Sequence, residues 1–308
     1  MLPKEPAKRP QLGFLYVPPF RITGLSIAGE ETVVYVPELD VCFDIGSCPK
    51  AVLPAPTVAL THGHMDHVAG IAYYFSQRPF QGMTPGTVVC HPELKPALDK
   101  LMEAWIDIER QKTPHEIVAI EPGERYEIKN NHYLEAFETI HTVPSLGYTV
   151  VEKRTKLRDE FAGLSQDELV EKKKAGEDIT NTFMIPLVTF TGDTAWGDHM
   201  LMETVLNSRV IITECTFLEP GHRKRAGIGK HLHLDHIIEL LDASSPESAV
   251  ILTHLSRRTH MGQVRRAIEK ALPSRHRDRL LVLMDGRANR DRYERQLAEA
   301  EAAAVGND

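Results

Sequence analysis

The sequence predicts an α+β fold in which two β-sheets pack face to face and helices cover their outer surfaces. Three observations support this prediction. Short apolar runs separated by turn residues follow one another through the first half of the chain. Strand and helix patterns alternate through the second half. The chain of 308 residues is also long enough to bury a large core.

The first half is rich in predicted strands. Period-two alternation and β-branched residues between turn signals predict strands at 21–27, 32–36, 41–45, 51–60, 87–90, 116–120, 124–128 and 133–139. Two helices are predicted between them, at 68–77 and 92–112. The second has an apolar face formed by Leu94, Leu98, Leu101, Met102, Trp105 and Ile108.

The second half alternates between the two kinds of element. Strands are predicted at 183–190, 210–214, 249–253 and 280–284, and helices at 199–206, 235–241, 261–271 and 289–304. The segment 152–180 is charged and poor in aromatic residues, which favours an inserted, exposed helical arm. We therefore expect one domain at 14–287, the arm at 152–180, and a C-terminal helix and tail at 288–308.

Composition excludes several classes of protein. The net charge of -7 and the pI near 6.1 argue against a generic basic nucleic-acid coat, so any cations for nucleic acid must be concentrated locally. No apolar run reaches the ~20 residues that span a bilayer, and residues 1–13 lack the apolar core of a signal peptide. The four cysteines form no CxxC pair, which favours reduced thiols in a cytoplasmic protein.

A cluster of potential metal ligands follows the apolar run at 57–60. It contains His62, His64, Asp66 and His67, and imidazole with carboxylate suits zinc or a similar divalent metal. A lone histidine after a strand is usually only a polar loop residue. However, three further single residues follow other predicted strands, namely His141, Asp193 and His254. Together these residues predict a metal site built from several strand ends.

These residues resemble the metallo-β-lactamase superfamily and, within it, the ribonuclease Z (tRNase Z) family in its short plant-type form. The resemblance covers roughly residues 24–258. It rests on the motifs His62-x-His64-x-Asp66-His67, His141-x3-Ser145-x-Gly147-Tyr148, Thr-Gly-Asp193-Thr, Glu214-Cys215-Thr216-Phe217, His231-Leu232-His233 and His254-Leu255-Ser256-x-Arg258. It implies a four-layer αββα sandwich and an endonuclease that removes the 3′ trailer of precursor tRNA.

The resemblance also implies a site with two Zn²⁺ ions, for which Mn²⁺ is an alternative. One ion is expected on His62, His64 and His141 and the other on Asp66, His67 and His254, with Asp193 between them. Such a pair of ions generates hydroxide and neutralises charge on a phosphoryl transition state.

The catalytic residues expected from this resemblance are Asp66, Glu214 and His231. His231 would protonate the leaving oxygen, with Glu214 keeping it charged. His233 and His236 remain alternatives for the acid, Glu214 could instead form an ordinary ion pair, and Asp235 is expected to be only a helix N-cap.

Substrate contacts are predicted at cations near the ligands and at one serine, namely Arg223, Lys224, Arg225, Arg258 and Ser145. The arm at 152–180 stands where ribonuclease Z enzymes carry a tRNA-gripping arm, and clasping tRNA in this way implies a homodimer. Two other functions remain open. One is a phosphodiesterase for a small or cyclic nucleotide with the same site, and the other is a non-catalytic metal-bound scaffold.

Overall fold

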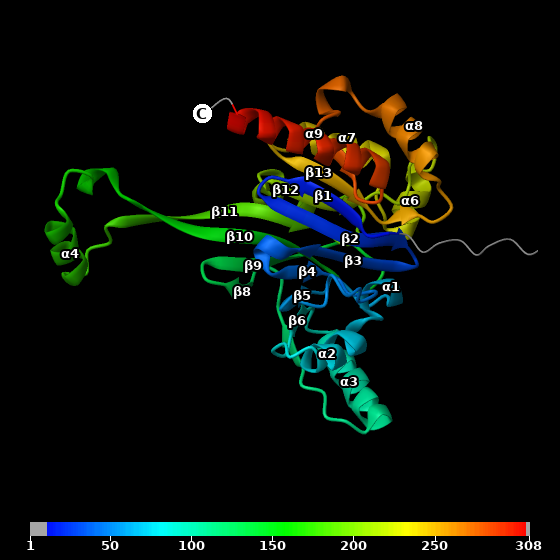
Figure 1. Ribbon diagram of the computed structural model, residues 1–308, viewed down its shortest axis with the longest axis horizontal. Coiled ribbons are helices and arrows are strands. Elements are labelled where there is room, and N and C mark those ends of the chain that lie inside the picture. The colour runs from blue at the N-terminus through cyan, green and yellow to red at the C-terminus, as the bar shows by residue number, and fades with distance from the viewer. Residues whose placement is uncertain (1–10, 306–308) are drawn as a thin grey trace, which may run out of the picture.

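The computed structural model describes residues 11–305. The N-terminal segment before residue 11 and the last three residues of the predicted tail lie outside the described residues. Two mixed sheets pack face to face with helices on both outer sides (Figure 1), so the predicted four-layer αββα fold is confirmed. None of the helices within residues 11–305 combines the length and the apolar character that a membrane span requires.

The first sheet follows chain order. It runs β1 (Gly13–Val17), β2 (Phe20–Ala28), β3 (Glu31–Val36), β4 (Val41–Phe43), β5 (Thr57–Ala59), β6 (Thr87–Cys90) and β7 (Glu116–Ala119), and the short β14 (Leu255–Ser256) pairs with β2. The pairs from β1 to β4 are antiparallel, and those from β4 to β7 are parallel.

The second sheet has the order β15 (Leu280–Val282), β13 (Ala249–Thr253), β12 (Val210–Glu214), β11 (Thr180–Phe190), β10 (Leu146–Leu157), β9 (His132–Glu138) and β8 (Arg125–Lys129). Neighbours from β11 to β15 are parallel, while β8 to β11 are antiparallel. Strands β9, β11, β12 and β13 therefore all run in one direction, and their carboxyl ends lie at one edge of this sheet.

Helices form the outer layers. Those over the first sheet are α2 (Ile71–Phe80) and α3 (Lys95–Glu109), and those over the second are α5 (Glu203–Leu206), α7 (Leu234–Ala243) and α8 (Met261–Ala271) (Figure 1). Helix α9 (Gly286–Val305) packs against β1. The remaining helical elements are α1 (Met65–Val68), α4 (Gln166–Lys174), α6 (Arg223–Gly229) and the 3-10 turns Pro37–Leu39, Asp159–Phe161, Asp198–Leu201 and Ser274–His276.

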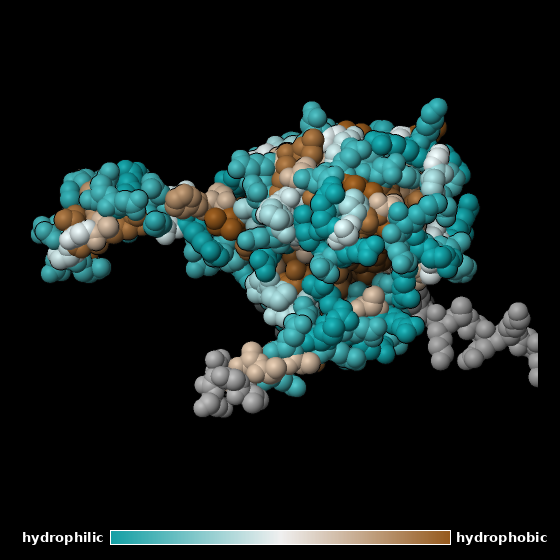
Figure 2. Space-filling view, turned by 90° about the horizontal axis from the view of Figure 1, so that it is seen from above, coloured by the Kyte–Doolittle hydropathy of each residue, from teal (hydrophilic) through white to brown (hydrophobic). Residues whose placement is uncertain are grey.

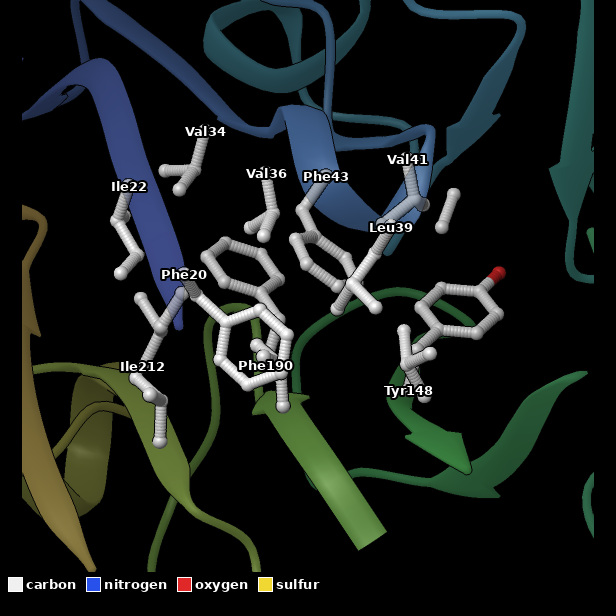
Figure 3. Close-up of a cluster of buried hydrophobic side chains, with 14 of the residues drawn as sticks. Phe20, Ile22, Val34, Val36, Leu39, Val41, Phe43, Tyr148, Phe190 and Ile212 are labelled. Atoms are coloured by element: carbon white, nitrogen blue, oxygen red, sulfur yellow. The ribbon is translucent and has the colours of Figure 1, made fainter. Parts of the chain in front are cut away.

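The core between the sheets holds the strand ends in place. Phe43 of β4 stacks on Phe190 of β11 with ring centroids 5.0 Å apart, in a cluster drawn from both sheets (Figure 3). Fully burying each such side chain contributes about 1.5–3 kcal/mol. Tyr148 donates a hydrogen bond to the carbonyl of Leu60 at 2.8 Å, which ties the second sheet to the segment just before the histidine cluster.

The segment 152–180 differs from the predicted helical arm. Strands β10 and β11 continue beyond the sheet as an antiparallel ribbon whose last pair is Leu157 with Thr180. Only the tip is helical, where Ser165 and Glu168 form a capping box at the start of α4. The ribbon projects from the body (Figures 1 and 2). Cross-strand backbone hydrogen bonds override the helix-favouring charged residues in the ribbon part of β10.

Other predictions of elements need smaller corrections. The strand expected at 51–60 spans only β5, because Pro54 and Pro56 cannot donate backbone hydrogen bonds to a ladder. The predicted helix at 92–112 is α3, which is shorter at both ends. Strands β1 and β10 were not predicted, and the cationic loop before residue 231 contains the short helix α6.

Candidate active site

The candidate site lies where strands of both sheets end. The histidine cluster follows β5, His141 follows β9, Asp193 follows β11, and His254 follows β13. Residues from positions 62 to 254 thus meet in one place, as the sequence predicts. All seven predicted ligands belong to groups whose ligand atoms lie within 4.8 Å of one another.

The first group consists of three histidines. His62 Nε2 lies 3.0 Å from His64 Nδ1, and His141 Nε2 lies 3.2 Å from the same atom. His62 and His141 are buried and His64 is half-buried. Burial, followed by the neighbouring histidines, lowers the pKa of His62 to about 2. A neutral imidazole is the form that binds a metal ion.

The second group combines two carboxylates with two histidines. Asp193 Oδ2 lies 3.4 Å from His67 Nε2 and 3.3 Å from His254 Nε2, and it is 4.0 Å from His62 Nε2 in the first group. Asp66 Oδ2 lies 3.7 Å from His67 Nε2 and 3.4 Å from His254 Nε2. Asp193 is therefore the carboxylate placed between the two groups.

The buried polar atoms of this cluster fit metal ions. His67 Nε2 is fully buried and has no hydrogen-bond partner among the described residues, which is costly for a polar atom unless a ligand binds it. Burial alone would raise the pKa of Asp193, but His254 and His67 hold that pKa well below its usual range. An ionised carboxylate beside several imidazoles is a donor set suited to divalent zinc-like metals.

Asp44 is a residue of the site that sequence reasoning missed. It follows β4 and accepts hydrogen bonds from the backbone and hydroxyl of Thr61 at 2.7 and 2.9 Å. Its other oxygen lies 2.7 Å from Nδ1 of His67, so the ring donates there and keeps Nε2 directed at Asp66 and Asp193. The only sequence pattern that could have revealed Asp44 is a lone aspartate after an apolar strand, and this pattern also occurs in ordinary loops.

Two residues of the site have unusual backbone conformations. Asp44 has a φ of 57° and His254 has a φ of 51°, both in the left-handed region that side chains other than glycine avoid. The backbone N–H of His254 donates to Ser26 Oγ at 2.8 Å, which helps to hold this conformation. The surrounding contacts therefore fix the direction of both side chains.

Glu214 and His231 form a pair beside the ligands. His231 Nδ1 lies 2.8 Å from Glu214 Oε1, and the carboxylate is buried while the imidazole is 19% exposed. The His231 ring stacks on that of His254 with centroids 5.4 Å apart. Burial lowers the pKa of His231, but the Glu214 carboxylate outweighs it and the net effect raises this pKa to about 9. His231 is therefore protonated at neutral pH and partly open to solvent.

Thr216 connects this pair to a predicted ligand. Its hydroxyl donates to Glu214 Oε2 at 2.6 Å and lies 3.0 Å from His254 Nδ1. With Nδ1 donating to Thr216, the Nε2 of His254 is left to face the carboxylates. The backbone N–H of Thr194 completes the environment of Glu214 by donating to Oε1 at 2.8 Å.

The two histidines considered as alternative acids, His233 and His236, form hydrogen bonds that belong to the start of helix α7. His233 is the N-cap of α7, where its Nδ1 accepts from the backbone of Asp235 and its Nε2 contacts the carbonyl of Glu219 at 3.0 Å. His236 accepts from the backbone N–H of His233 and stacks on Trp196. Asp235 is thus not the N-cap that the sequence predicted. Glu214 contacts His231 rather than either of these residues.

The residues predicted to contact the substrate differ in whether their side chains are already engaged by other residues of the protein. Arg223 forms ion pairs with Asp235 and Glu239, and the Ser145 hydroxyl is buried against Thr139. Lys224, Arg225 and Arg258 are exposed, and none of them forms an ion pair within residues 11–305. On the arm, the cations Arg154, Lys156, Arg158 and Lys172 all pair with neighbouring acids.

Comparison with known proteins agrees with this arrangement. A model of the beta-lactamase superfamily domain matches residues 46–255. The metallo-β-lactamase fold protein YhfI from Bacillus subtilis has a similar structure, with a TM-score of 0.55 at 15% identity over 89% of this chain and 96% of that one. Fold and site together therefore define a member of the metallo-β-lactamase superfamily, a metal-dependent hydrolase.

The chain belongs to the ribonuclease Z family within this superfamily. It is 34% identical over 274 residues to the chloroplastic tRNase Z TRZ2 of Arabidopsis thaliana, covering 87% of this chain and 76% of that protein. It is 32% identical to tRNase Z TRZ1 of the same plant, covering 87% and 96%. The short form of human tRNase Z, ELAC1, has a TM-score of 0.50 at 16% identity and covers 80% of this chain and 91% of that one.

Proposed function

We propose that this protein is a zinc-dependent endoribonuclease that removes the 3′ trailer of precursor tRNA. The observation that carries the proposal is the Glu214–His231 pair, in which Nδ1 of His231 lies 2.8 Å from Oε1 of Glu214 beside the predicted metal ligands. The Glu214 carboxylate outweighs burial and raises the pKa of His231 to about 9, which favours the protonated ring. Hydrolysis of a phosphodiester needs both a nucleophile and an acid that protonates the leaving oxygen. The predicted metal ligands would hold the ions that supply the nucleophile, and His231 would be the acid. Relatives named tRNase Z at 32% and 34% identity support tRNA as the substrate.

Two Zn²⁺ ions, or Mn²⁺ in their place, are proposed as cofactors. His62, His64 and His141 would hold one, Asp66, His67 and His254 would hold the other, and Asp193 would serve both. When bound, the ions supply hydroxide at neutral pH and neutralise charge on the phosphoryl group. Asp44 holds the ring of His67 in place for this task.

His231 is proposed as the general acid. Its Nδ1 faces Glu214, so the proton on Nε2 is the one available to the leaving 3′ oxygen. Glu214 stabilises the imidazolium and fixes the ring. Asp66 contributes as a ligand, with its Oδ2 held by the backbone N–H of Gly29 at 2.8 Å.

Substrate binding is proposed at the exposed cations around the site. Lys224, Arg225 and Arg258 lie on segments next to His231 and His254, where phosphate contacts would position the RNA backbone. Arg223 is already engaged with Asp235 and Glu239, and would have to exchange these partners for phosphate. Ser145 is proposed to shape this region from within the fold, through its hydrogen bond with Thr139.

The arm and a homodimer are proposed to complete tRNA binding. The ribbon places its tip far from the metal ligands (Figure 1), so an arm that grips the body of a tRNA would serve a distant active site. In the proposed pair of subunits, this distant active site is that of the partner. The four cysteines are free thiols, which supports a cytoplasmic location for such an assembly.

A phosphodiesterase for a small or cyclic nucleotide is the second candidate. It is favoured by the pairing of most arm cations with acids, which reduces their attraction for tRNA phosphates.

One experiment separates the two candidates. The purified protein, loaded with zinc, is incubated in parallel with a precursor tRNA carrying a 3′ trailer and with cyclic nucleotides. We expect a single cut at the 3′ end of the tRNA and little turnover of cyclic nucleotides. Preferential hydrolysis of the cyclic nucleotides would overturn the proposal, and the His231→Ala variant controls for a contaminating nuclease.

A further inference from the structure

The positive charge of this chain is concentrated near its C-terminal end. Residues 257–296 contain eleven arginines, one lysine and only five acids, whereas the whole chain has a net charge of -7. They include α8, β15 and the first half of α9, and both helices lie above the sheets in Figure 1. Such a concentration of cations in an otherwise acidic protein attracts a polyanion to this one side of the molecule.

Most of these cations are not needed to hold the fold together. Arg257, Arg265 and Arg275 pair with acids, and Arg279 donates to backbone carbonyls. The other eight, which we call the arginine face, form neither an ion pair nor a side-chain hydrogen bond within residues 11–305. They are Arg258, Arg266, Lys270, Arg277, Arg287, Arg290, Arg292 and Arg295. Their donors are therefore free for a ligand.

A cavity of about 460 Å³ lies among these residues, between α8, β15 and α9. Four arginines line it, namely Arg265, Arg277, Arg292 and Arg295, and so do three acids, Glu269, Asp278 and Asp285. Arg265 donates to both oxygens of Asp285, at 2.7 and 2.5 Å, and so neutralises this acid. The Nε of Arg292 is buried without a hydrogen-bond partner among the described residues. An unpartnered buried donor is costly, and an anion in the cavity would supply its acceptor.

The arginine face begins near the edge of the sheet that carries the predicted metal ligands. β15 pairs in parallel with β13, and His254 follows β13 directly. Neighbouring strands lie about 4.8 Å apart, so the start of α9 lies close to this edge. The helix then runs away from it along β1, where Gln296 donates to the carbonyl of Tyr16. From Arg287 to Arg295 the face thus continues for about 12 Å along α9.

The chemistry of this surface fits a phosphate backbone. Between residues 257 and 296, all of which the structure describes, no large apolar side chain is exposed. A helix that lies on a membrane needs such an apolar side. The ring of Tyr293 packs edge-on against Phe14, with centroids 5.3 Å apart, so it offers no open platform for a base. Guanidinium groups without aromatic neighbours bind phosphates and tolerate any sequence.

We propose that the arginine face binds the backbone of the 3′ trailer, the part of the precursor tRNA that the cut releases. The inference rests on the proposed function and deepens it. A trailer has no fixed fold, so a site for it has to recognise phosphates rather than a shape. The arm and the cations of α6 are the contacts proposed for the tRNA itself. A strand that leaves the metal ligands beside His254 meets Arg287 and Arg290 first and then the cavity.

The first test varies the length of the trailer. Two precursors share one tRNA body, and one has a short trailer that ends at the site while the other has a long one that reaches along α9. In the double variant Arg292→Gln/Arg295→Gln, we expect KM for the long-trailer precursor to rise about tenfold, with kcat unchanged, since two phosphate contacts are lost. KM for the short-trailer precursor should stay within about twofold of wild type.

A matched control removes two cations elsewhere. Arg110 and Lys112 are exposed beyond the end of α3, on the opposite side of the sheets from α9 (Figure 1). The control Arg110→Gln/Lys112→Gln changes the net charge equally, and it should leave both KM values within about twofold of wild type. A second variant, Arg287→Gln/Arg290→Gln, changes only exposed side chains of the arginine face and should reproduce the trailer-specific loss.

The second test measures binding without cleavage. A labelled single-stranded RNA with the trailer sequence is titrated with each protein at several salt concentrations, and fluorescence anisotropy gives the affinity. For single strands, each lost phosphate contact lowers the slope of log K against log salt by about 0.7, so the glutamine double variant should lose about 1.4. Arg292→Lys/Arg295→Lys keeps the charge and should keep most of the slope.

Each outcome decides the inference. An equal rise in KM for both trailer lengths would place the tRNA body on the arginine face and overturn the trailer proposal. Unchanged KM values and salt slopes, or tighter binding to vesicles of anionic lipid than to the RNA, would also overturn it, while the proposed function would stand. If the wild-type protein cuts neither precursor, the proposed function fails, and the anisotropy measurement still decides whether the face binds RNA.

Discussion

The ligand cluster and the arm contrast in how they hold their charged groups. In the cluster, the carboxylates and imidazoles are buried or half-buried, and the ligand atoms of each group lie within 4.8 Å of one another, on loops fixed by both sheets and by Asp44. On the arm, charged side chains are exposed, and most of its cations pair with near neighbours along the ribbon or helix. Side chains that are rigid and desolvated interact strongly, whereas exposed pairs are screened by water. Substitutions should therefore have large effects in the cluster and small or substrate-specific effects on the arm.

The largest effect is expected from removing the carboxylate between the two groups. Asp193→Ala and Asp66→Ala should each lower bound metal and reduce phosphodiester hydrolysis by more than about a thousandfold, since activation of water depends on the ions. Metal content by mass spectrometry and turnover are measured on the same samples. Normal turnover after metal loss would contradict a dinuclear centre.

A smaller effect is expected from replacing His231, and it should lower turnover without lowering metal content. His231→Ala should keep its metal and lose about 10²–10⁴-fold in turnover, the usual contribution of a general acid. Glu214 raises the pKa of His231 to about 9, so the protonated form is present below this pH and is lost above it. The wild-type rate should consequently fall as the pH rises through about 9. A wild-type rate in the variant would remove the acid role.

Removal of the arm should affect one substrate only. Replacing residues 152–180 by a short glycine-containing turn should reduce precursor tRNA cleavage by about tenfold or more, through lost contacts far from the reaction. Hydrolysis of a small chromogenic phosphodiester should be unchanged, since no predicted ligand lies on the ribbon. An equal loss with both substrates would instead make the arm a structural element.

The smallest effect is expected from a single ion pair of the arm. Lys172 lies 2.8 Å from Glu177, with both side chains partly exposed. Lys172→Ala should change the free energy of unfolding by less than about 1 kcal/mol, the usual range for exposed pairs. Urea denaturation measures this change. A loss of several kcal/mol would show that the arm is more rigidly coupled to the body than its exposed surface indicates.

The contrast also explains what could be predicted from sequence. His62, His64 and His254 could be found because residue types that bind metals are unusual after apolar strands, and parallel strands bring such ends together. Asp44 could not, because a lone aspartate after a strand has the same pattern whether or not it supports a ligand. Its role depends on the position of His67, which only the three-dimensional structure provides.

The arm and α3 show what the periodicity of a sequence cannot predict about its structure. The run of charged residues at 152–157 is compatible with a helix or an exposed strand, and backbone pairing with β11 decides between them. In α3 the predicted apolar face contains both buried Leu98 and exposed Ile108. Periodicity indicates that a helix is amphipathic, but it does not indicate which part of its apolar face the same subunit covers.

The backbone at Asp44 and His254 has a consequence for engineering this protein. Left-handed conformations cost about 1–2 kcal/mol in residues other than glycine, so a design guided by folding stability alone would replace both residues with glycine. Such variants would relax the backbone and at the same time delete one proposed ligand and the support of another. Thermostabilised versions should therefore keep these two positions fixed and seek their gains elsewhere, for example in exposed loops.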